Sequence, residues 1–293
     1  MHEVFIVGCG DVGARVAARW RARGLPVSAL ARSADTTARL QGRGIRPVAG
    51  DLDEPVSLRR IAVHGMLVYH LAPPPAEGES DPRMRHWLAA LDANAHRPER
   101  IVYISTTGVY GNSDGGWVTE GTPATPQTAR GKRRLDAENA LRAWGREHGV
   151  PVVILRVPGI YGPGRLPVAA IKERRPVVAE IESGFTNRIH SEDLADICVA
   201  AAERGRPDSI YNVSDGHPGT LAGYYNAVAD ALGLPRPPVI SRDAAGRVLS
   251  EGMLSYLRES RRIDNRRMLE ELGVTLRYPT LEAGLKASLA DTL

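Results

Sequence analysis

A short apolar run, residues 4–7, leads directly into Gly8, Gly10 and Gly13 and constrains the fold more than any other feature. This spacing, after a strand and before a helix, is typical of a turn that binds the pyrophosphate of a dinucleotide. Gly8 allows the tight turn, Gly10 lets the pyrophosphate approach the backbone, and Gly13 lets the helix pack close to the strand. The amides at the helix N-terminus are expected to face the anion. The residues expected to bind the cofactor here are Gly8, Gly10, Asp11, Val12 and Gly13.

The first half of the chain alternates apolar runs with helical segments. Alternating units of this kind build a parallel sheet with helices on both faces. The sequence therefore predicts an α/β protein with a doubly wound parallel sheet of the Rossmann type. The expected strands are 4–7, 27–30, 45–49, 66–71, 101–105 and 152–157, and the expected helices are 12–23, 33–41, 82–95 and 128–148.

The second half is less regular, and no clean linker separates it from the first. We therefore expect a smaller lobe that interleaves with the core. The predicted Rossmann core spans residues 1–157, with residues 188–213 returning to it. The predicted substrate-binding lobe spans residues 158–187 and 214–293. Further helices are expected at 192–204, 221–232 and 266–272, and a further strand at 210–213.

The composition favours a cytoplasmic protein that binds neither membranes nor nucleic acid. No apolar run approaches the ~20 residues of a membrane helix, and the first residues do not resemble a signal peptide. Cys9 and Cys198 lie far apart without metal-ligand spacing, which indicates a reducing compartment and no metal site. The net charge is +4, but the basic residues are spread along the chain without a basic stripe.

The second expected strand ends in Arg32 and Ser33, where dinucleotide-binding proteins often carry an acid for the adenine ribose. A guanidinium and a hydroxyl suit a 2′-phosphate instead, so the sequence favours NADP over NAD. Asp51 follows the third strand, where its carboxylate either accepts a hydrogen bond from adenine or caps a turn. Residues after the third, fourth and sixth strands are also expected to contact the cofactor. These are Leu52, Leu71, Ala72, Pro73 and Pro158.

Several segments together resemble the extended short-chain dehydrogenase/reductase superfamily, in its NAD(P)-dependent epimerase/dehydratase group. They are residues 68–72, 103–111, 155–164, 188–195 and 211–214. The resemblance implies a Rossmann core, a substrate lobe and redox chemistry on a hydroxyl or carbonyl group, as in sugar nucleotides. It also implies that a Ser or Thr hydroxyl after the fifth strand orients the substrate oxygen. That position falls on Thr106, with Ser105 beside it.

The chain departs from this family where a Tyr-x-x-x-Lys pair is expected on the next helix. Arg130 stands at the tyrosine position and Arg134 at the lysine position, which resembles an atypical subgroup without the pair. Arginine stays protonated at any working pH, so Arg130 cannot act as a general base. We expect Arg130 to bind an anion or polarise a carbonyl, and Arg134 to contact the ribose or a phosphate.

Three residues are considered as carriers of the proton, and for one of them, Tyr161, the alternative is a role in a turn or in the wall of the substrate site. Tyr110 would become a useful acid or base if Arg130 and Arg134 lowered its pKa, and the alternative is a tyrosine that packs in the core. Lys132 would exchange protons if it were buried beside these arginines, and the alternative is a lysine that faces solvent.

The sequence thus predicts an atypical NADP-dependent oxidoreductase or epimerase/dehydratase-like enzyme. The alternative is an NADP(H)-binding sensor or regulatory protein with little catalytic activity, because the Tyr/Lys pair is missing. The expected partner is a small molecule, and the arginines of the second lobe suggest that it carries an anionic group. The sequence leaves open whether the chain is a monomer or a homodimer formed through residues 82–95 and 128–148.

Overall fold

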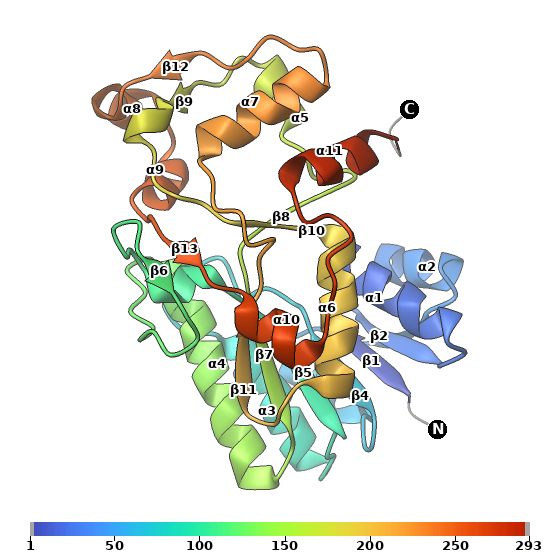
Figure 1. Ribbon diagram of the computed structural model, residues 1–293. Helices are drawn as coiled ribbons and strands as arrows, with labels where there is room; N and C mark the ends of the chain where they lie inside the picture. Colours follow the sequence, from blue (N-terminus) through green and yellow to red (C-terminus); the bar gives the residue numbers. More distant parts are fainter. Residues whose placement is uncertain (1–2, 291–293) are drawn as a thin grey trace.

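A seven-stranded parallel sheet forms the centre of the protein, as the computed structural model, which describes residues 3–290, shows (Figure 1). The strand order is β11-β7-β5-β4-β1-β2-β3. This order confirms the doubly wound Rossmann sheet, and each expected strand of the core is present. The strands are β1 (Val4–Val7), β2 (Val27–Ala31), β3 (Arg46–Ala49), β4 (Leu67–His70), β5 (Arg100–Thr106), β7 (Val152–Val157) and β11 (Ser209–Asn212).

The strand order reverses beside β1, which pairs with β2 on one side and with β4 on the other. At such a switch point, the loops that leave the two strands diverge and open a crevice at the carboxyl ends of the strands. All four residues of β1 and all six of β7 are buried, because helices cover both faces of the sheet. The crevice is therefore the place where this fold presents backbone and side chains to a ligand.

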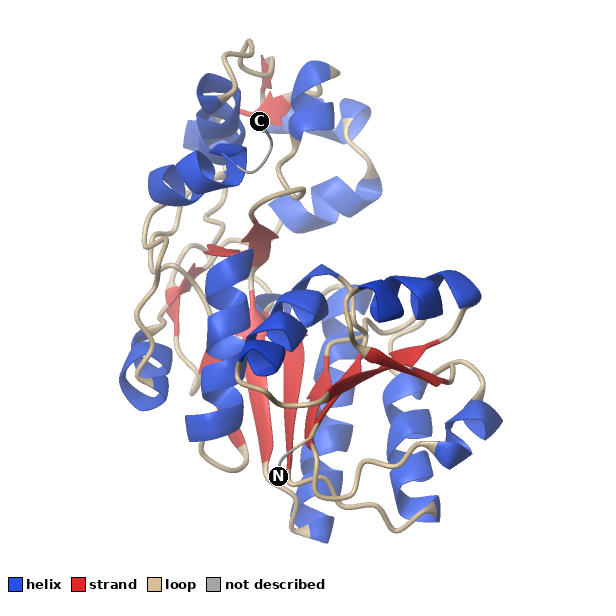
Figure 2. Cartoon of the chain, turned by 90° about the vertical axis from the view of Figure 1, so that its right-hand side faces the viewer, coloured by secondary structure: helices blue, strands red, loops and turns tan. Residues whose placement is uncertain are grey.

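Helices cover the two faces of the sheet in separate layers, which Figure 2 shows. One face carries α1 (Asp11–Ala22), α2 (Ala34–Gly42), α6 (Ser191–Arg204) and α10 (Arg266–Leu272). The other carries the 3₁₀ turn η1 (Pro55–Arg60), α3 (Pro82–Ala93) and α4 (Ala129–His148). No helix within residues 3–290 combines the length and the apolar character needed to cross a bilayer.

A smaller lobe lies beyond the carboxyl ends of the strands (Figure 1). Its own small core packs α5 and α11 against α7 through Ile171, Val228, Ala229 and Leu285. The lobe contains α5 (Val168–Lys172), β9 (Val177–Val178), η3 (Glu180–Glu182), α7 (Leu221–Ala231), β12 (Val239–Ile240), α8 (Arg242–Val248), α9 (Glu251–Leu257) and α11 (Leu281–Ala290).

Short parallel strand pairs join distant parts of the chain around the crevice. β8 (Gly159–Tyr161) pairs with β10 (Arg188–His190), and β6 (Trp117–Val118) pairs with β13 (Arg262–Ile263). These strands have only two or three residues, too few for a periodic pattern, and the sequence analysis did not predict them. The first pair places the segment after β7 beside the segment before α6 (Ser191–Arg204), and the second places the segment after β5 beside the segment after α9.

The assignment of all of residues 214–293 to the second lobe needs correction at α10. This helix contacts α6 and β11, and its Met268 and Leu272 are fully buried in the main core. The two side chains are four residues apart and therefore lie on one face of the helix, which completes the layer over α6. α10 is thus part of the Rossmann core, although it follows most of the lobe in the chain.

Candidate functional site

A cavity of about 580 Å³ opens at the carboxyl ends of β1, β2, β3 and β4. Its walls include many of the residues that the sequence analysis assigned to the cofactor. The residues of that prediction that line the cavity are Gly8, Gly10, Arg32, Asp51, Leu52, Leu71, Ala72 and Pro73. This volume lies in the range of small-molecule and cofactor sites.

The glycine turn after β1 has the close contacts that its spacing implies. Gly8 has a φ of +91°, and a Cβ added there would lie 2.4 Å from the backbone nitrogen of Ala72. A Cβ on Gly13 would lie 2.9 Å from the carbonyl oxygen of Gly8. Gly10, in contrast, has no atom within 4 Å of an added Cβ, so its exposed backbone is open to a ligand. The turn therefore fits the pyrophosphate of a dinucleotide.

The N-terminus of α1 carries a carboxylate that two arginines neutralise. Asp11 accepts hydrogen bonds from Nε of Arg15 at 3.0 Å and from Nε of Arg165 at 2.6 Å. With its charge balanced, Asp11 opposes an incoming phosphate less than a free carboxylate would. The side chain of Val12 is buried in the core, so its contribution to binding is limited to its backbone amide.

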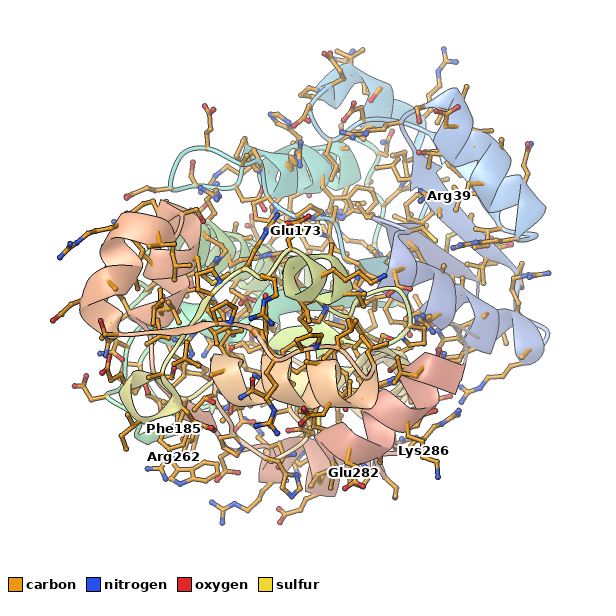
Figure 3. All side chains as sticks on the ribbon, turned by 90° about the horizontal axis from the view of Figure 1, so that it is seen from above. Arg39, Glu173, Phe185, Arg262, Glu282 and Lys286 are labelled. Atoms are coloured by element: carbon orange, nitrogen blue, oxygen red, sulfur yellow. The ribbon has the colours of Figure 1, made fainter. Side chains whose placement is uncertain are left out.

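Three side chains line the cavity at its β2 side, and they come from the end of β2 and from α2. Arg32, Thr36 and Arg39 line the cavity, and Arg39 is labelled on α2 in Figure 3. Within residues 3–290, neither arginine forms a hydrogen bond or an ion pair. Ser33 does not line the cavity but caps α2, where its Oγ accepts the amide of Thr36 at 3.2 Å.

Thr36 and Arg39 line the cavity although they were not predicted from the sequence. Ser33 is the N-cap of α2 and so defines where this helix begins. Positions 36 and 39 lie three residues apart and so share one face of that helix. This spacing was the signal that would have placed both residues beside Arg32. Asp51, nearby, lines the cavity and also forms a turn, since its Oδ1 accepts the amide of Asp53 at 3.0 Å.

A second, narrower cavity of about 180 Å³ lies at the carboxyl ends of β5 and β7, and we call it the cleft. Thr106 and Arg130 line it on the core side, and Tyr256 lines it from the lobe. The hydroxyl of Thr106 accepts the amide of Gly108 at 3.1 Å, which begins the 3₁₀ turn η2 (Thr107–Tyr110). The cleft and the cofactor cavity share no lining residue, but they open at the carboxyl ends of the neighbouring strands β5 and β4.

Ser105 and Pro158 are placed differently from the sequence-based expectation. Ser105 is only 3 % exposed and does not line the cleft, and its hydroxyl has no hydrogen-bond partner within residues 3–290. It is therefore a buried neighbour of Thr106 and not a second residue facing the substrate. Pro158 lines the cleft, whereas it was expected to contact the cofactor. It follows β7, on the far side of β5 from the cofactor cavity.

The two arginines of α4 have different surroundings. Arg130 is exposed in the cleft, and within the described residues its guanidinium has no hydrogen-bond or ion-pair partner. Arg134 donates from Nη1 to the carbonyl of Ile104 at 2.9 Å and to the hydroxyl of Tyr103 at 3.1 Å. Arg134 thus holds the end of β5 in place and lines neither cavity. Arg130 is the arginine that is available to a ligand.

Neither Tyr110 nor Lys132 has the environment expected of a proton carrier. Tyr110 is 1 % exposed, and its hydroxyl donates to Oδ1 of Asn212 at 2.7 Å. The guanidinium of Arg156 lies 4.7 Å from the ring centre, yet burial raises the pKa of Tyr110 above its ordinary value. The expected lowering is wrong, and Tyr110 is a packing residue. Lys132 is not buried, and its Nζ pairs with Oε1 of Glu79 at 2.7 Å.

The lobe contributes a buried charged pair to the cleft that the sequence did not reveal. Arg261 donates from Nη2 to Oε2 of Glu259 at 2.7 Å, and its Nη1 donates to the carbonyl of Gly111. The next residue, Arg262, lies over the ring of Phe185 at 5.0 Å, and the two are labelled together in Figure 3. The contacts depend on the pairing of β6 with β13, which no local pattern indicates. Within residues 3–290 no cluster of His, Cys, Asp or Glu could hold a metal ion.

The fold and the glycine turn define a dinucleotide-binding protein of the Rossmann class. Residues 4–214 match the model of the NAD dependent epimerase/dehydratase family, and the chain belongs to this family. Protein YeeZ of Escherichia coli (strain K12) is 30% identical over 293 residues, which cover 95% of this chain and 97% of YeeZ. These matches confirm the family that the sequence segments resemble.

Solved structures extend the similarity over the whole chain. A conserved protein of unknown function from Silicibacter pomeroyi DSS shares 31% identity, covers 99% of both chains and has a TM-score of 0.86. The UDP-glucose 4-epimerase of Thermotoga maritima, solved with UDP-glucose, shares 20% identity and has a TM-score of 0.80. It covers 98% of this chain and 97% of its own. At that identity the second likeness establishes a common fold.

Proposed function

We propose that the protein is an NADP-dependent oxidoreductase or epimerase/dehydratase-type enzyme that acts on a hydroxyl or carbonyl group of a small molecule. The observation that carries this proposal is the adjacency of two cavities, one built by the glycine turn and one containing Thr106 and Arg130. A substrate in the cleft would lie beside the reactive end of a dinucleotide bound along the carboxyl ends of β1 to β4. Membership of the family supports the same assignment.

The preference for NADP rests on the charges around the adenosine end of the cavity. Arg32 and Arg39 line this end without an acidic partner among the described residues. Arg83, which also lines the cavity, is already bound to Asp53 through two hydrogen bonds of 2.6 and 2.7 Å. A 2′-phosphate would give Arg32 and Arg39 the anion that they lack, whereas a 2′-hydroxyl would not.

In the cleft, the chain supplies groups that bind and orient the reacting oxygen. A bound nicotinamide dinucleotide supplies the donor or acceptor of a hydride. The hydroxyl of Thr106 would hydrogen-bond the substrate oxygen, and Arg130 would stabilise negative charge that develops on it. Since arginine keeps its proton at any working pH, Arg130 acts as an electrostatic group and not as a general base.

Calorimetric titration of the purified protein with NADP⁺, NADPH, NAD⁺ and NADH tests the cofactor assignment. We expect NADP(H) to bind more tightly than NAD(H). Arg32→Ala and Arg39→Ala should each weaken NADP(H) binding by about 10- to 100-fold, because each removes charged hydrogen bonds of ~1.5–3 kcal/mol. The same variants should leave the affinity for NAD(H) nearly unchanged, since NAD(H) lacks the 2′-phosphate.

Arg59→Ala is the matched control, because Arg59 is exposed on η1 of the same half but does not line the cavity. Its affinity for all four nucleotides should equal that of the wild type. Tighter binding of NAD(H) than of NADP(H) would contradict the cofactor preference. The absence of binding by any of the four nucleotides would contradict the proposed function as a whole.

A further inference from the structure

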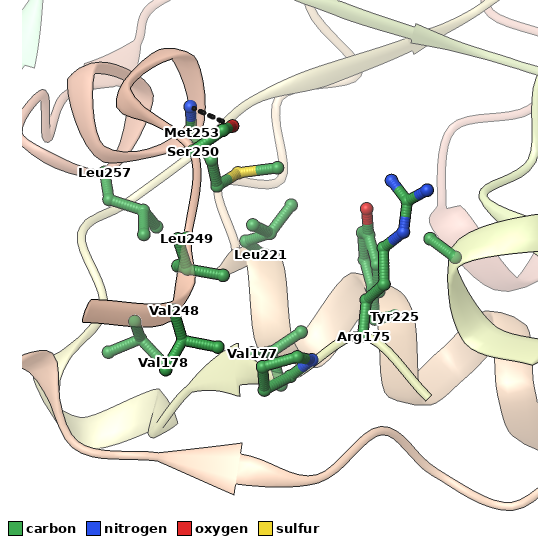
Figure 4. Close-up of a pocket in the computed structure, with 12 residues that line it drawn as sticks. Arg175, Val177, Val178, Leu221, Tyr225, Val248, Leu249, Ser250, Met253 and Leu257 are labelled. Carbon is green, nitrogen blue, oxygen red and sulfur yellow. Dashed lines mark hydrogen bonds between the residues drawn. The ribbon is translucent and has the colours of Figure 1, made fainter. Parts of the chain in front are cut away.

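The small lobe encloses a cavity of about 320 Å³ that lies outside both the cofactor cavity and the cleft. We call it the lobe cavity. It lies between α5, β9, α7 and the α8–α9 segment, and Figure 4 shows the side chains gathered around it. Most of its wall is aliphatic. The apolar side chains of this wall include Val177, Val178, Leu221, Leu249, Met253 and Leu257.

Two polar side chains on this wall, Ser250 and Arg175, already have partners, and Tyr225 adds a hydroxyl. Ser250 uses its hydroxyl to cap α9, where it accepts the amide of Met253. Arg175 donates from Nη2 and Nε to Glu173 at 2.7 and 2.8 Å. The lobe cavity therefore offers no unpaired cation that would bind a diphosphate. An apolar group, in contrast, gains free energy there by leaving water.

The lobe cavity adjoins the cleft through consecutive residues of α9. Tyr256 lines the cleft, and Leu257 lines the lobe cavity. Burial raises the pKa of Tyr225, a wall residue of the lobe cavity, and Tyr256 lies close enough to add to this rise. α9 therefore forms part of the wall of both cavities, and a molecule that reacts beside Thr106 would have to pass this helix to reach the lobe cavity.

We propose that the lobe cavity binds the apolar part of the substrate, an aliphatic chain or fused ring of roughly ten carbon atoms. The size follows from the volume, which is about twice that of a 150 Å³ cavity known to hold benzene. The substrate class is thus an alcohol or ketone with a large hydrocarbon group and not a nucleoside diphosphate sugar. This inference rests on the proposed function, because it takes the cleft as the reacting end.

Titration of the whole protein with 1-butanol, 1-hexanol, 1-octanol and 1-decanol tests the inference without relying on catalysis. Affinity should rise about fourfold for each added CH₂ group, as expected for transfer from water to an apolar site. The rise should level off when the chain exceeds the cavity, at roughly ten carbons. Uridine 5′-diphosphate, titrated in parallel, should bind far more weakly than 1-decanol and should not displace it.

Met253→Trp fills the lobe cavity and should abolish the dependence of affinity on chain length. Val248→Trp is a second variant at the cavity rim, where Val248 is 58 % exposed and a larger side chain is tolerated without repacking. Ile181→Trp is the matched control, because Ile181 lies in the same lobe, is 94 % exposed and does not line the cavity. It should bind the alcohols as the wild type does.

Two results would overturn the inference: affinity that does not depend on chain length, or displacement of 1-decanol by uridine 5′-diphosphate. Either result leaves the proposed function standing if NADP(H) still binds in the titration described above. Failure of NADP(H) to bind, in contrast, removes the proposed function and with it the assignment of the alcohols as substrates. The two failures are therefore distinguished by which ligand fails to bind.

Discussion

Arginine is frequent along this chain, and the partners of each arginine decide its role. Arg156 is buried and donates to both carboxylate oxygens of Glu138, at 2.7 and 3.1 Å. Arg130 and Arg32 lie at cavity walls without such a partner among the described residues. The sequence could identify Arg130 and Arg32 from their positions after known motifs. It could not show that Arg134 binds carbonyl oxygens, because those oxygens belong to the loop after β4 and to β5, which are distant in sequence.

The pair of Arg156 and Glu138 should be important for stability. Glu138→Ala leaves the buried guanidinium without its counterion, and we expect the free energy of unfolding to fall by about 3–5 kcal/mol. Glu251→Ala is the control, since its pair with Arg258 at 3.2 Å is exposed on both sides and should change stability by less than about 0.5 kcal/mol. Chemical denaturation measures both values. A loss below about 1 kcal/mol for Glu138→Ala would contradict the prediction.

At the scale of elements, the sequence predicted the sheet and the long helices but not the short strands. The central strands β1, β4 and β7 are mostly apolar and buried along their whole length, and this makes them visible in the sequence. The strands β6, β8, β9, β10, β12 and β13 have two or three residues each. Their positions depend on pairing between distant segments, which a local pattern does not contain. Six of the twelve residues that line the cleft come from the stretches just before β10 and β13, and so Arg261 and Tyr256 were missed.

Two substitutions in the glycine turn should have different effects, one mainly on stability and the other mainly on nucleotide binding. Gly8→Ala places a Cβ against the backbone of Ala72 at a φ of +91°, so the free energy of unfolding should fall by more than about 2 kcal/mol. Gly10→Ala meets no atom within 4 Å and should change stability by less than about 1 kcal/mol while weakening nucleotide binding. Denaturation and calorimetry measure the two effects. Equal losses of stability in both variants would disprove this division of roles.

At the scale of the whole molecule, the chain crosses between core and lobe several times. One crossing follows β11, where the amide of Asp215 donates to the carbonyl of Arg188 at 2.9 Å and ties the segment to β10. The irregular second half of the sequence indicated that segments of the lobe alternate with segments of the core along the chain. It did not indicate that α10 returns to the core, because a short amphipathic helix can pack on an apolar surface of the core or of the lobe.

The burial of Asp215 should make the stability of the protein depend on pH. Burial raises the pKa of Asp215 to about 6, from an ordinary value of 3.8. Between about pH 4 and pH 6 the folded state therefore keeps a proton that the unfolded state has released, and the free energy of unfolding falls as pH rises. At pH 7 this loss reaches at most about 3 kcal/mol, from ~1.4 kcal/mol for each pKa unit.

Asp215→Asn should remove this dependence, because asparagine does not titrate and its carbonyl can still accept the amide of His217. The variant should gain stability relative to the wild type as the pH is raised from 4 to 7. Urea denaturation at a series of pH values measures the difference. Parallel pH profiles for the two proteins would show that Asp215 does not titrate in this range.

The late position of α10 in the chain has a consequence for synthesis on the ribosome. The side chains that line the cofactor cavity, from Gly8 to Arg83, are translated before those that line the cleft, from Thr106 to Arg261. α10 emerges after both, and until then the apolar surface of α6 that Met268 and Leu272 cover remains open to other molecules in the cell. The growing chain thus presents its nucleotide-binding residues first, its cleft next, and the helix that closes its core last.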